Sequence, residues 1–274
     1  MNSGGSWMLL EANAKINIGL LVGNKRPDGY HDIETIIARI SLSDSIEAKI
    51  SEASETSVTI KGNERYIGEG TDLMEKAALC FSSWTGIRFS LDIAIDKRIP
   101  VEAGLGGGSS DAAAILNALN EYFSFPINKD ALVKKSVEIG SDVPFFVSGY
   151  SGALVTGKGE AVAETAVPHG SPLYLFLPKE RISTGNAYGK LDAIKRPERH
   201  LPSLSSSFPS RITHPNDFEL LYNGSVPFSE EAMEKCYISL SGSGSSWFLL
   251  PTPEHVCAVE NFPDYAILSE YFVI

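Results

Sequence analysis

The sequence predicts a mixed α/β (α+β) protein with two domains. Its 274 residues are more than one compact domain usually holds and enough for two that share a cleft. Residues 14–22 and 89–95 alternate between apolar and polar side chains, as half-buried strands do, whereas the apolar residues of 115–123 recur at helical spacing. The composition changes at 165–172, which suggests a boundary between a first domain, 1–165, and a second, 166–274.

The first predicted strand carries the clearest alternation. One of its faces holds Ile16, Ile18, Leu20 and Val22, and the other holds Lys15, Asn17 and Gly19. After a polar turn at 24–29, strand-like sequence continues to about residue 62, with a hairpin predicted around Ser43-Asp44. The segment 89–95 is a further strand.

Helix signals occur at three places. Thr71-Asp72 opens the first helix, and Glu75 stands three places beyond Asp72 to complete a capping box. The second helix follows a glycine-rich stretch, and its apolar face is formed by Ile115, Leu116, Leu119, Tyr122 and Phe123. Residues 130–139 form the third, which Gly140 stops. The Pro- and Ser-rich segment 196–215 is expected to be an exposed loop.

The composition excludes several kinds of partner. The formal net charge is −11, and no run of Lys and Arg forms the basic face that nucleic acid needs. The first eight residues lack a secretory signal, and no apolar run reaches membrane-spanning length. Cys80, Cys236 and Cys257 are odd in number and widely spaced, which argues against a zinc site or a disulfide framework. We therefore expect a cytoplasmic protein with neither nucleic acid nor membrane as partner.

Residues 100–114 read PVEAGLGGGSSDAAA and hold four glycines in five positions. Without Cβ atoms, glycines let backbone N–H groups approach a ligand closely. Ser109 and Ser110 can cap the following helix, whose positive dipole end lies where a phosphate would sit. The stretch is no Walker loop, because no Gly-Lys-Ser/Thr ends it, and Ser109 replaces the last glycine of a dinucleotide fingerprint. The alternative is a flexible turn; the serines and the Ala-rich helix start favour a phosphate cradle.

From Pro100 to Ala113 the loop resembles the signature of the GHMP kinases, Pro-x3-Gly-Leu-Gly-Ser/Gly-Ser-Ser-Ala-Ala, with one extra Gly and with Asp111 before the alanines. The variant GLGGGSSDAA is similar to one branch of this family, which phosphorylates a cytidine-diphosphate-linked methylerythritol in non-mevalonate isoprenoid synthesis. Other segments that resemble the branch follow in order: Ala14 to Asn17, Arg26 to His31, Gly140 to Phe146, Asn216 to Glu219 and Ser241 to Ser245. The resemblance covers nearly the whole chain in register.

This resemblance implies a two-domain GHMP-kinase-like fold with the active site in the cleft between the domains. It implies that ATP, with Mg²⁺ as the ATP complex, donates its γ-phosphate to the 2-hydroxyl of the linked methylerythritol. The implied ATP-binding residues are Pro100, Val101, Glu102, Ala103, Gly104, Leu105, Gly106, Gly107, Gly108, Ser109 and Ser110. The implied catalytic residues are Lys15 and Asp142, and the implied substrate-binding residues are Asn17, Tyr30, His31, Thr184 and Tyr188. No residue is implied as a metal ligand.

Phosphoryl transfer needs positioned charges more than covalent chemistry. Asp142 precedes the apolar run 143–147 and is either a turn or cap aspartate or the carboxylate that faces the acceptor hydroxyl, as a base or as an orienting charge. Lys15 is either an edge lysine that reaches to solvent or, with the resemblance, the cation that holds Asp142 and the reacting oxygens. Asn17 shares the strand face of Lys15 and is placed to orient the same hydroxyl.

The acceptor end is expected to recognise a flat base. Tyr30 and Tyr188 sandwich the cytosine ring in this hypothesis, while His31 reads its edge, largely through its backbone. The nearest alternative is a homoserine- or mevalonate-type kinase, which the Asp-Gly-Tyr-His turn at 28–31 speaks against. We expect a small-molecule substrate and a chain that acts as a monomer or a weak homodimer.

Two positions depart from the pattern of the branch. Glu102 places a carboxylate in the phosphate loop, and Gly185 stands where a proline is common. Neither is expected to carry chemistry, so they affect the detail of the loops. A non-catalytic nucleotide-binding protein of the same fold is the alternative from another class; it would be expected to lack Lys15 or Asp142, and both are present.

Overall fold

A computed structural model describes residues 6–62, 72–179, 184–194, 200–202, 209, 213–222, 228, 230–252 and 265–274. The strands are β1 (Trp7–Lys25), β2 (His31–Glu52), β3 (Ser57–Lys61), β4 (Phe89–Asp96), β5 (Gly152–Gly157), β6 (Ala161–Glu164), β7 (Pro172–Pro178), β8 (Cys236–Leu240), β9 (Trp247–Pro251) and β10 (Tyr265–Phe272). The helices are α1 (Leu73–Thr85), α2 (Gly107–Tyr122), α3 (Lys129–Ser136), α4 (Val143–Ser148), α5 (Thr184–Leu191), α6 (Glu230–Lys235) and the 3₁₀ helix η1 (Asp217–Tyr222). The predicted mixed α/β fold is confirmed.

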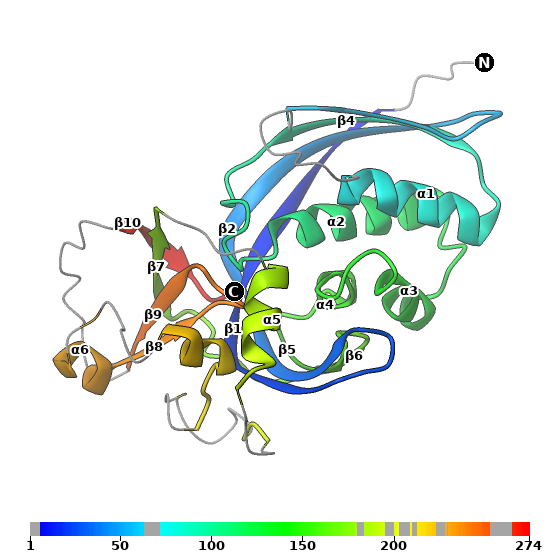
Figure 1. The fold of residues 1–274 in the computed structure, drawn as a ribbon. Helices are drawn as coiled ribbons and strands as arrows, with labels where there is room; N and C mark the ends of the chain where they lie inside the picture. Colours follow the sequence, from blue (N-terminus) through cyan, green and yellow to red (C-terminus); the bar gives the residue numbers. More distant parts are fainter. Residues whose placement is uncertain are drawn as a thin grey trace.

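The larger sheet is built on the long strands β1 and β2, which pair antiparallel. Its order is β3-β4-β2-β5-β6, with β1 on the other edge of β2. Strands alternate their side chains between two faces, and helices α1 to α4 cover one face of this sheet (Figure 1). The core between them includes Phe81 of α1, Phe89 of β4, Leu116 of α2 and Phe145 of α4.

The smaller sheet has the order β10-β7-β9-β8, and its described pairings are antiparallel. It lies beside β1 and β2 (Figure 1), and one apolar cluster joins the two sheets. That cluster contains Ile16 and Ile18 of β1 together with Leu173 of β7 and Phe248 of β9. The first sheet's strands end at β6 and the second's begin at β7, on either side of residue 165; a domain boundary there stays a prediction.

Strand β2 continues without a break through Ser43-Asp44, so the hairpin predicted there is wrong. Asp44 is fully buried, and its carboxylate accepts hydrogen bonds from the backbone N–H groups of Arg98 (2.5 Å) and Ile99 (2.8 Å). A carboxylate satisfied in this way can stand inside a strand. The hairpin joins β1 to β2 instead, at the polar turn predicted for 24–29.

The structure has a helix at each of the three predicted places, with bounds that differ from the prediction. Asp72 is the N-cap of α1, and its side chain accepts a hydrogen bond from the N–H of Met74 at 2.7 Å. Helix α2 begins inside the glycine-rich stretch, at Gly107, and ends at Tyr122. Helix α3 ends at Ser136, earlier than the predicted 139, because the N–H groups of Glu138 and Ile139 bond three residues back, to the carbonyl oxygens of Lys135 and Ser136, as in a 3₁₀ turn.

The cysteines differ from expectation. Cys80 is a free thiol, but Cys236 is disulfide-bonded, although the spacing of the cysteines argued against a disulfide framework; Cys257 lies outside the described residues. The cysteine argument for a reducing compartment therefore loses its support. Most of the loop predicted at 196–215 also lies outside the described residues. Within the described ranges, no helix has the length and apolar character that crossing a membrane requires.

A buried charge cluster ties β2 to the segment after β4 and to α2. The Lys97 ammonium binds the carboxylate of Asp44 and, at 2.7 Å, that of Asp111. Burial alone would lower the pKa of Lys97, but Asp111 and Asp44 raise it. Burial, helped by Asp44 and opposed by Lys97, raises the pKa of Asp111 to about 8. One lysine balances one carboxylate, so Asp111 keeps its proton at neutral pH.

The protonated Asp111 predicts a pH-dependent stability. The folded chain holds this proton up to about pH 8, whereas the unfolded carboxyl releases it near its ordinary pKa of 3.8. Its contribution to the free energy of unfolding is therefore full below pH 3.8 and is lost as the pH rises through about 8. Asp111→Asn carries no titrating proton. The unfolding free energy of the wild type, relative to this variant, should fall with rising pH by at most about 1.4 kcal/mol per pH unit.

Urea titrations of both proteins across this pH range measure the difference. The control is Asp96→Asn, because Asp96 is an exposed carboxylate that binds the exposed side chain of Arg98. It should leave the pH profile of the wild type unchanged. A constant difference between wild type and Asp111→Asn at every pH would show that folding does not raise the pKa of Asp111.

Candidate active site

The N-terminus of α2 faces a cavity of about 940 Å³. Gly106, with a φ of 71°, is the N-cap of this helix. The prediction that Ser109 and Ser110 cap it is wrong: both lie inside its first turn, and the Ser110 hydroxyl donates to the carbonyl oxygen of Asn13 at 2.7 Å. The first N–H groups of a helix have no partner within it. They therefore stand ready to bind an anion at the positive end of the helix dipole.

A second glycine loop, residues 241–245, packs against the first. The Ser241 hydroxyl donates to the carbonyl oxygen of Gly104 at 2.8 Å, and a Cβ on Gly104 would lie 2.0 Å from the carbonyl oxygen of Ser241. The Asn216 side chain donates to the carbonyl oxygen of Gly242 at 2.9 Å. Only glycine at position 104 allows this contact, and Asn216 holds the second loop in place.

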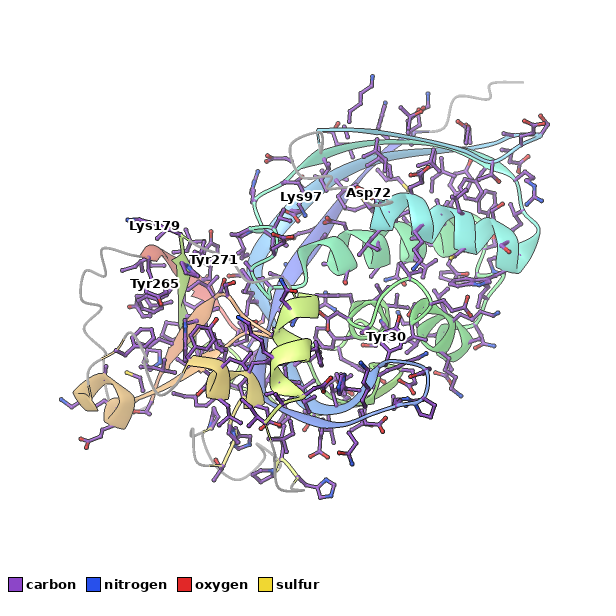
Figure 2. The ribbon with its side chains drawn as sticks, in the orientation of Figure 1. Tyr30, Asp72, Lys97, Lys179, Tyr265 and Tyr271 are labelled. Carbon is purple, nitrogen blue, oxygen red and sulfur yellow. The ribbon has the colours of Figure 1, made fainter. Side chains whose placement is uncertain are left out.

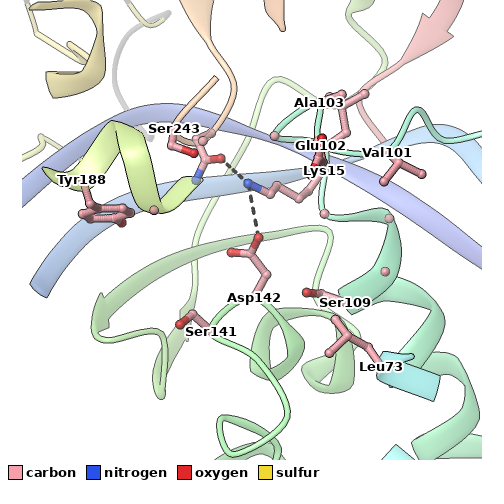
Figure 3. A pocket seen from close by; sticks show the side chains of 18 of the residues that line it. Lys15, Leu73, Val101, Glu102, Ala103, Ser109, Ser141, Asp142, Tyr188 and Ser243 are labelled. Atoms are coloured by element: carbon pink, nitrogen blue, oxygen red, sulfur yellow. Dashed lines mark hydrogen bonds and ion pairs between the residues drawn. The ribbon is translucent and has the colours of Figure 1, made fainter. Parts of the chain in front are cut away.

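Lys15 lies on β1 and is only 2% exposed. Its Nζ donates to Oδ1 of Asn17 and lies 3.5 Å from the carboxylate of Asp142 (Figure 3). Asn17 donates in turn to the Thr35 hydroxyl at 2.9 Å. Register shifts between β1 and β2 flank residues 15–18, and such bulges re-aim strand side chains. The structure thus brings together Lys15, Asn17 and Asp142.

Asp142 occupies the N-cap position of α4, but its side chain makes no capping hydrogen bond. The carboxylate instead points toward Lys15 and is partly open to the cavity (Figure 3). The preceding backbone is held by a close approach, since a Cβ on Gly159 would lie 2.0 Å from the carbonyl oxygen of Ser141. Burial, and then the charge of Asp142, raise the pKa of the Tyr188 hydroxyl, which therefore stays protonated.

The opposite end of the cavity is lined by rings. The rings of His31 and Tyr188 stack with centroids 5.0 Å apart and planes at 27°. Tyr30 is 54% exposed, and Nζ of Lys158 lies 5.0 Å from the centre of its ring. Tyr30 and Tyr188 thus both line the cavity, and the ring of Tyr188 also meets that of Phe218, with centroids 4.9 Å apart. Figure 2 shows Tyr30 well away from Lys97, which lines the cavity beside α2.

Most of the residues predicted for the site line this cavity. They are Lys15, Asn17, Tyr30, His31, Asp142, Tyr188 and every residue from Pro100 to Ser109. Ser110 does not line it and is buried. Thr184 is the first residue of α5, and its side chain lies outside what the structure describes. Glu102 has a φ of 56°, in the left-handed region that favours glycine.

The sequence reasoning missed charged residues at both ends. Lys97 and Asp111 line the cavity beside α2, and Lys25, Lys158 and Asp192 line it beside the rings. Asp192 stands four places after Tyr188, one helical turn along, a spacing from which it could have been found. Lys97 depends on carboxylates distant in the sequence and carries no local signal.

Lysines and carboxylic side chains both line the cavity, and the acidic ones are Asp72, Glu102, Asp111, Asp142 and Asp192. The lysines that line it are Lys15, Lys25, Lys97 and Lys158. Together with free backbone N–H groups, ammonium groups suit phosphates. In the part of the chain that the structure describes, no three His, Cys, Asp or Glu side chains form a group that could hold a metal ion. The cavity thus suits a polyphosphate at α2 and a second ligand against the rings.

Comparisons with known proteins agree with this site. Residues 72–150 match the GHMP kinases N-terminal domain. A 4-diphosphocytidyl-2-C-methyl-D-erythritol kinase of Bacillus licheniformis is 39% identical over 194 residues, which are 70% of this chain and 66% of that protein. The matched region spans 62–66% of the length of this and similar curated relatives.

Solved structures extend the likeness over the fold. The crystal structure of a 4-(cytidine 5'-diphospho)-2C-methyl-D-erythritol kinase has a TM-score of 0.68 and 31% identity, and the match covers 89% of this chain and 90% of that one. The Methanococcus jannaschii mevalonate kinase shares the fold, with a TM-score of 0.64 at 14% identity over 98% of this chain and 99% of its own. The match of α1 to α4 with the family domain, and the likeness to a solved kinase along most of its length, show that this chain belongs to the GHMP kinases.

Proposed function

We propose that this protein transfers the γ-phosphate of ATP to the 2-hydroxyl of 4-diphosphocytidyl-2-C-methyl-D-erythritol, giving ADP and the 2-phosphate. The observation that carries the proposal is the Lys15–Asp142 ion pair, at 3.5 Å, in one cavity with the N-terminus of α2 and the stacked rings of His31 and Tyr188. The relatives that bear the name of this kinase support the choice of acceptor.

The nucleotide would bind at α2. Its β- and γ-phosphates accept hydrogen bonds from the first N–H groups of the helix, and Lys15, whose stem passes Gly106, adds a positive charge to the same cavity. Mg²⁺ would arrive as the ATP complex and help to neutralise the transferred group. Since the described residues include no cluster of metal ligands, phosphate oxygens and water would supply most of its shell.

Transfer joins the acceptor oxygen to the γ-phosphorus and breaks the bond to the β-phosphate oxygen, which leaves on ADP. Asp142 accepts the hydrogen bond of the acceptor hydroxyl and takes its proton as the new bond forms. The Lys15 ammonium holds Asp142 in place and stabilises the charge on the transferred group. Asn17, bound to both Lys15 and Thr35, fixes the direction of the ammonium.

The acceptor end favours a nucleotide-linked alcohol over a small one. Tyr30 and Tyr188 offer ring faces to a base, and Lys25 and Lys158 lie beside them for a diphosphate. Homoserine and mevalonate carry neither a base nor a diphosphate and would leave these groups unused. The acceptor is therefore the cytidine-diphosphate-linked alcohol.

An acceptor panel tests the proposal directly. Purified protein with ATP and Mg²⁺ is given 4-diphosphocytidyl-2-C-methyl-D-erythritol, homoserine, mevalonate or phosphomevalonate, and ADP is measured. We expect acceptor-dependent ADP release with the cytidyl compound alone. If homoserine or mevalonate turned over as fast as the cytidyl compound, the proposed substrate would be wrong, although the chain would still belong to the kinase family.

The ion pair predicts a loss of turnover. Lys15→Ala and Asp142→Asn should each lower kcat by at least about a hundredfold, the low end for losing charge stabilisation or acid–base help. The dissociation constant of ATP should change little, because α2 holds most of the phosphates. Steady-state kinetics and calorimetry measure the two quantities.

A matched pair of residues serves as the control. Lys49 and Asp92 face each other on β2 and β4 of the same sheet, away from the cavity. Lys49→Ala and Asp92→Asn should retain normal kcat. Near-normal turnover in the Lys15 or Asp142 variant would remove that residue from the mechanism.

The phosphate cradle predicts a steric block of ATP. Gly108 is the second residue of α2, and a Cβ there would meet only Leu73, at 3.5 Å. Gly108→Val should therefore fold normally but place its side chain where phosphate binds. We expect the ATP dissociation constant to rise about tenfold or more, since overpacking a filled site costs about 1–3 kcal/mol.

Gly185 provides the control, because it is the second residue of α5, lines the opposite end of the cavity and has open space around its Cβ position. Calorimetry of Gly185→Val should give an unchanged ATP affinity. If folded Gly108→Val bound ATP as the wild type does, the start of α2 would not be the nucleotide site.

A further inference from the structure

A hydrogen bond at the acceptor end joins the two sides of the cavity. His31 begins β2, and Asp192 follows the last residue of α5. Nε2 of His31 lies 2.7 Å from Oδ1 of Asp192, and His31 is 8% exposed while it lines the cavity. The second oxygen of Asp192 lies 3.9 Å from Nζ of Lys25. The imidazole is thus held from both sides, by the carboxylate at its edge and by Tyr188 on its face.

The carboxylate determines which ring nitrogen carries the proton. An ionised carboxylate only accepts hydrogen bonds, so Nε2 of His31 must donate. A neutral imidazole with its proton on Nε2 has a lone pair on Nδ1, which accepts. No hydrogen bond of Nδ1 occurs within the ranges that the structure describes. His31 therefore presents one acceptor to a ligand in the cavity.

We propose that Asp192 is a positioning residue that sets the choice of base: it holds the proton on Nε2 of His31, so that Nδ1 accepts a hydrogen bond from the exocyclic amine of cytosine. This inference rests on the proposed function and changes the expected reading of the base from the backbone of His31 to its side chain. Uracil has a carbonyl oxygen in place of the amine. Two acceptors would then face each other, and a site built to bind an N–H group rejects a ligand that lacks it.

The competing explanation is a purely structural tie between α5 and β2. Such a tie would affect the stability of the fold and the use of every acceptor equally. A tautomer role alters the ratio between cytidine and uridine ligands. The ratio of kcat/KM for the two acceptors therefore separates the explanations, and the ratio of binding constants for CDP and UDP gives the same readout without catalysis.

The decisive variant is Asp192→Asn. Its amide has nearly the same shape but offers a donor as well as an acceptor to Nε2, so the imidazole proton is no longer confined to Nε2 and Nδ1 becomes a donor in part of the molecules. The acceptors are 4-diphosphocytidyl-2-C-methyl-D-erythritol and its uridine-diphosphate analogue, with Mg²⁺ and ATP. We expect the wild type to prefer the cytidyl compound by at least about tenfold, and the preference of the variant to fall by about tenfold or more, the scale of one base-edge contact. The KM for ATP should not change.

Two further variants complete the experiment. Asp192→Glu keeps a carboxylate and should retain much of the preference for cytidine, which makes it the conservative rescue. Lys25→Met removes the other partner of Asp192 without touching His31, so it should leave the cytidine-to-uridine ratio unchanged even if both KM values rise.

The outcomes separate this inference from the proposed function. A folded Asp192→Asn enzyme with the wild-type ratio, or a wild type that uses both acceptors equally, overturns the role of Asp192 and leaves the kinase assignment standing. A wild type that phosphorylates neither compound overturns the proposed function and this inference with it. If Asp192→Asn fails to fold, an Asp192→Glu enzyme that loses the cytidine preference overturns the inference, and one that keeps it supports it.

Discussion

An ammonium group shut away from water must be matched by dipoles and negative charge, and Lys15 imposes this requirement on its surroundings. β1 carries the lysine into the interior, so its partners come from Asn17 on the same strand and from Asp142 at the start of α4. Two glycines leave it room: a Cβ on Gly106 would lie 3.0 Å from its Cγ, and one on Gly242 would lie 3.3 Å from its Nζ. Both glycine loops are therefore arranged around one side chain.

Lys97, the second buried lysine, is also neutralised by its neighbours, but by two carboxyl groups. Lys97 lies between two carboxyl groups, and the proton on Asp111 leaves the cluster with one positive and one negative charge. A cluster that is neutral in this way adds little field to the cavity. The attraction for a phosphate near α2 then comes from the helix terminus and from Lys15, which is where the transferred group would lie.

Local patterns predicted the parts of the site that local geometry controls. Lys15 and Asn17 share a strand face because they stand two residues apart, and the glycine-rich stretch lies at the start of a helix and lines the cavity. The predictions failed where the local structure depends on groups that are distant in the sequence. Asp44 looked like a turn residue, but backbone N–H groups more than fifty residues away, at 98 and 99, bind its carboxylate inside a strand. Ser109 looked like a cap, but the flexible Gly106 starts the helix earlier.

The ladder between β1 and β2 connects the two ends of the cavity. Lys15 pairs with Arg39 on this ladder, and Lys25 pairs with His31 farther along it. If the proposed function is correct, the same two strands carry Lys15, beside the transferred phosphate, and His31, which binds the base. Their geometry then fixes the distance between the two groups. The number of residues between the two pairs, with the bulges that bend the strands, sets the span an acceptor must have. Alcohols without a diphosphate spacer would then be rejected for their length, whatever base or other group they carry.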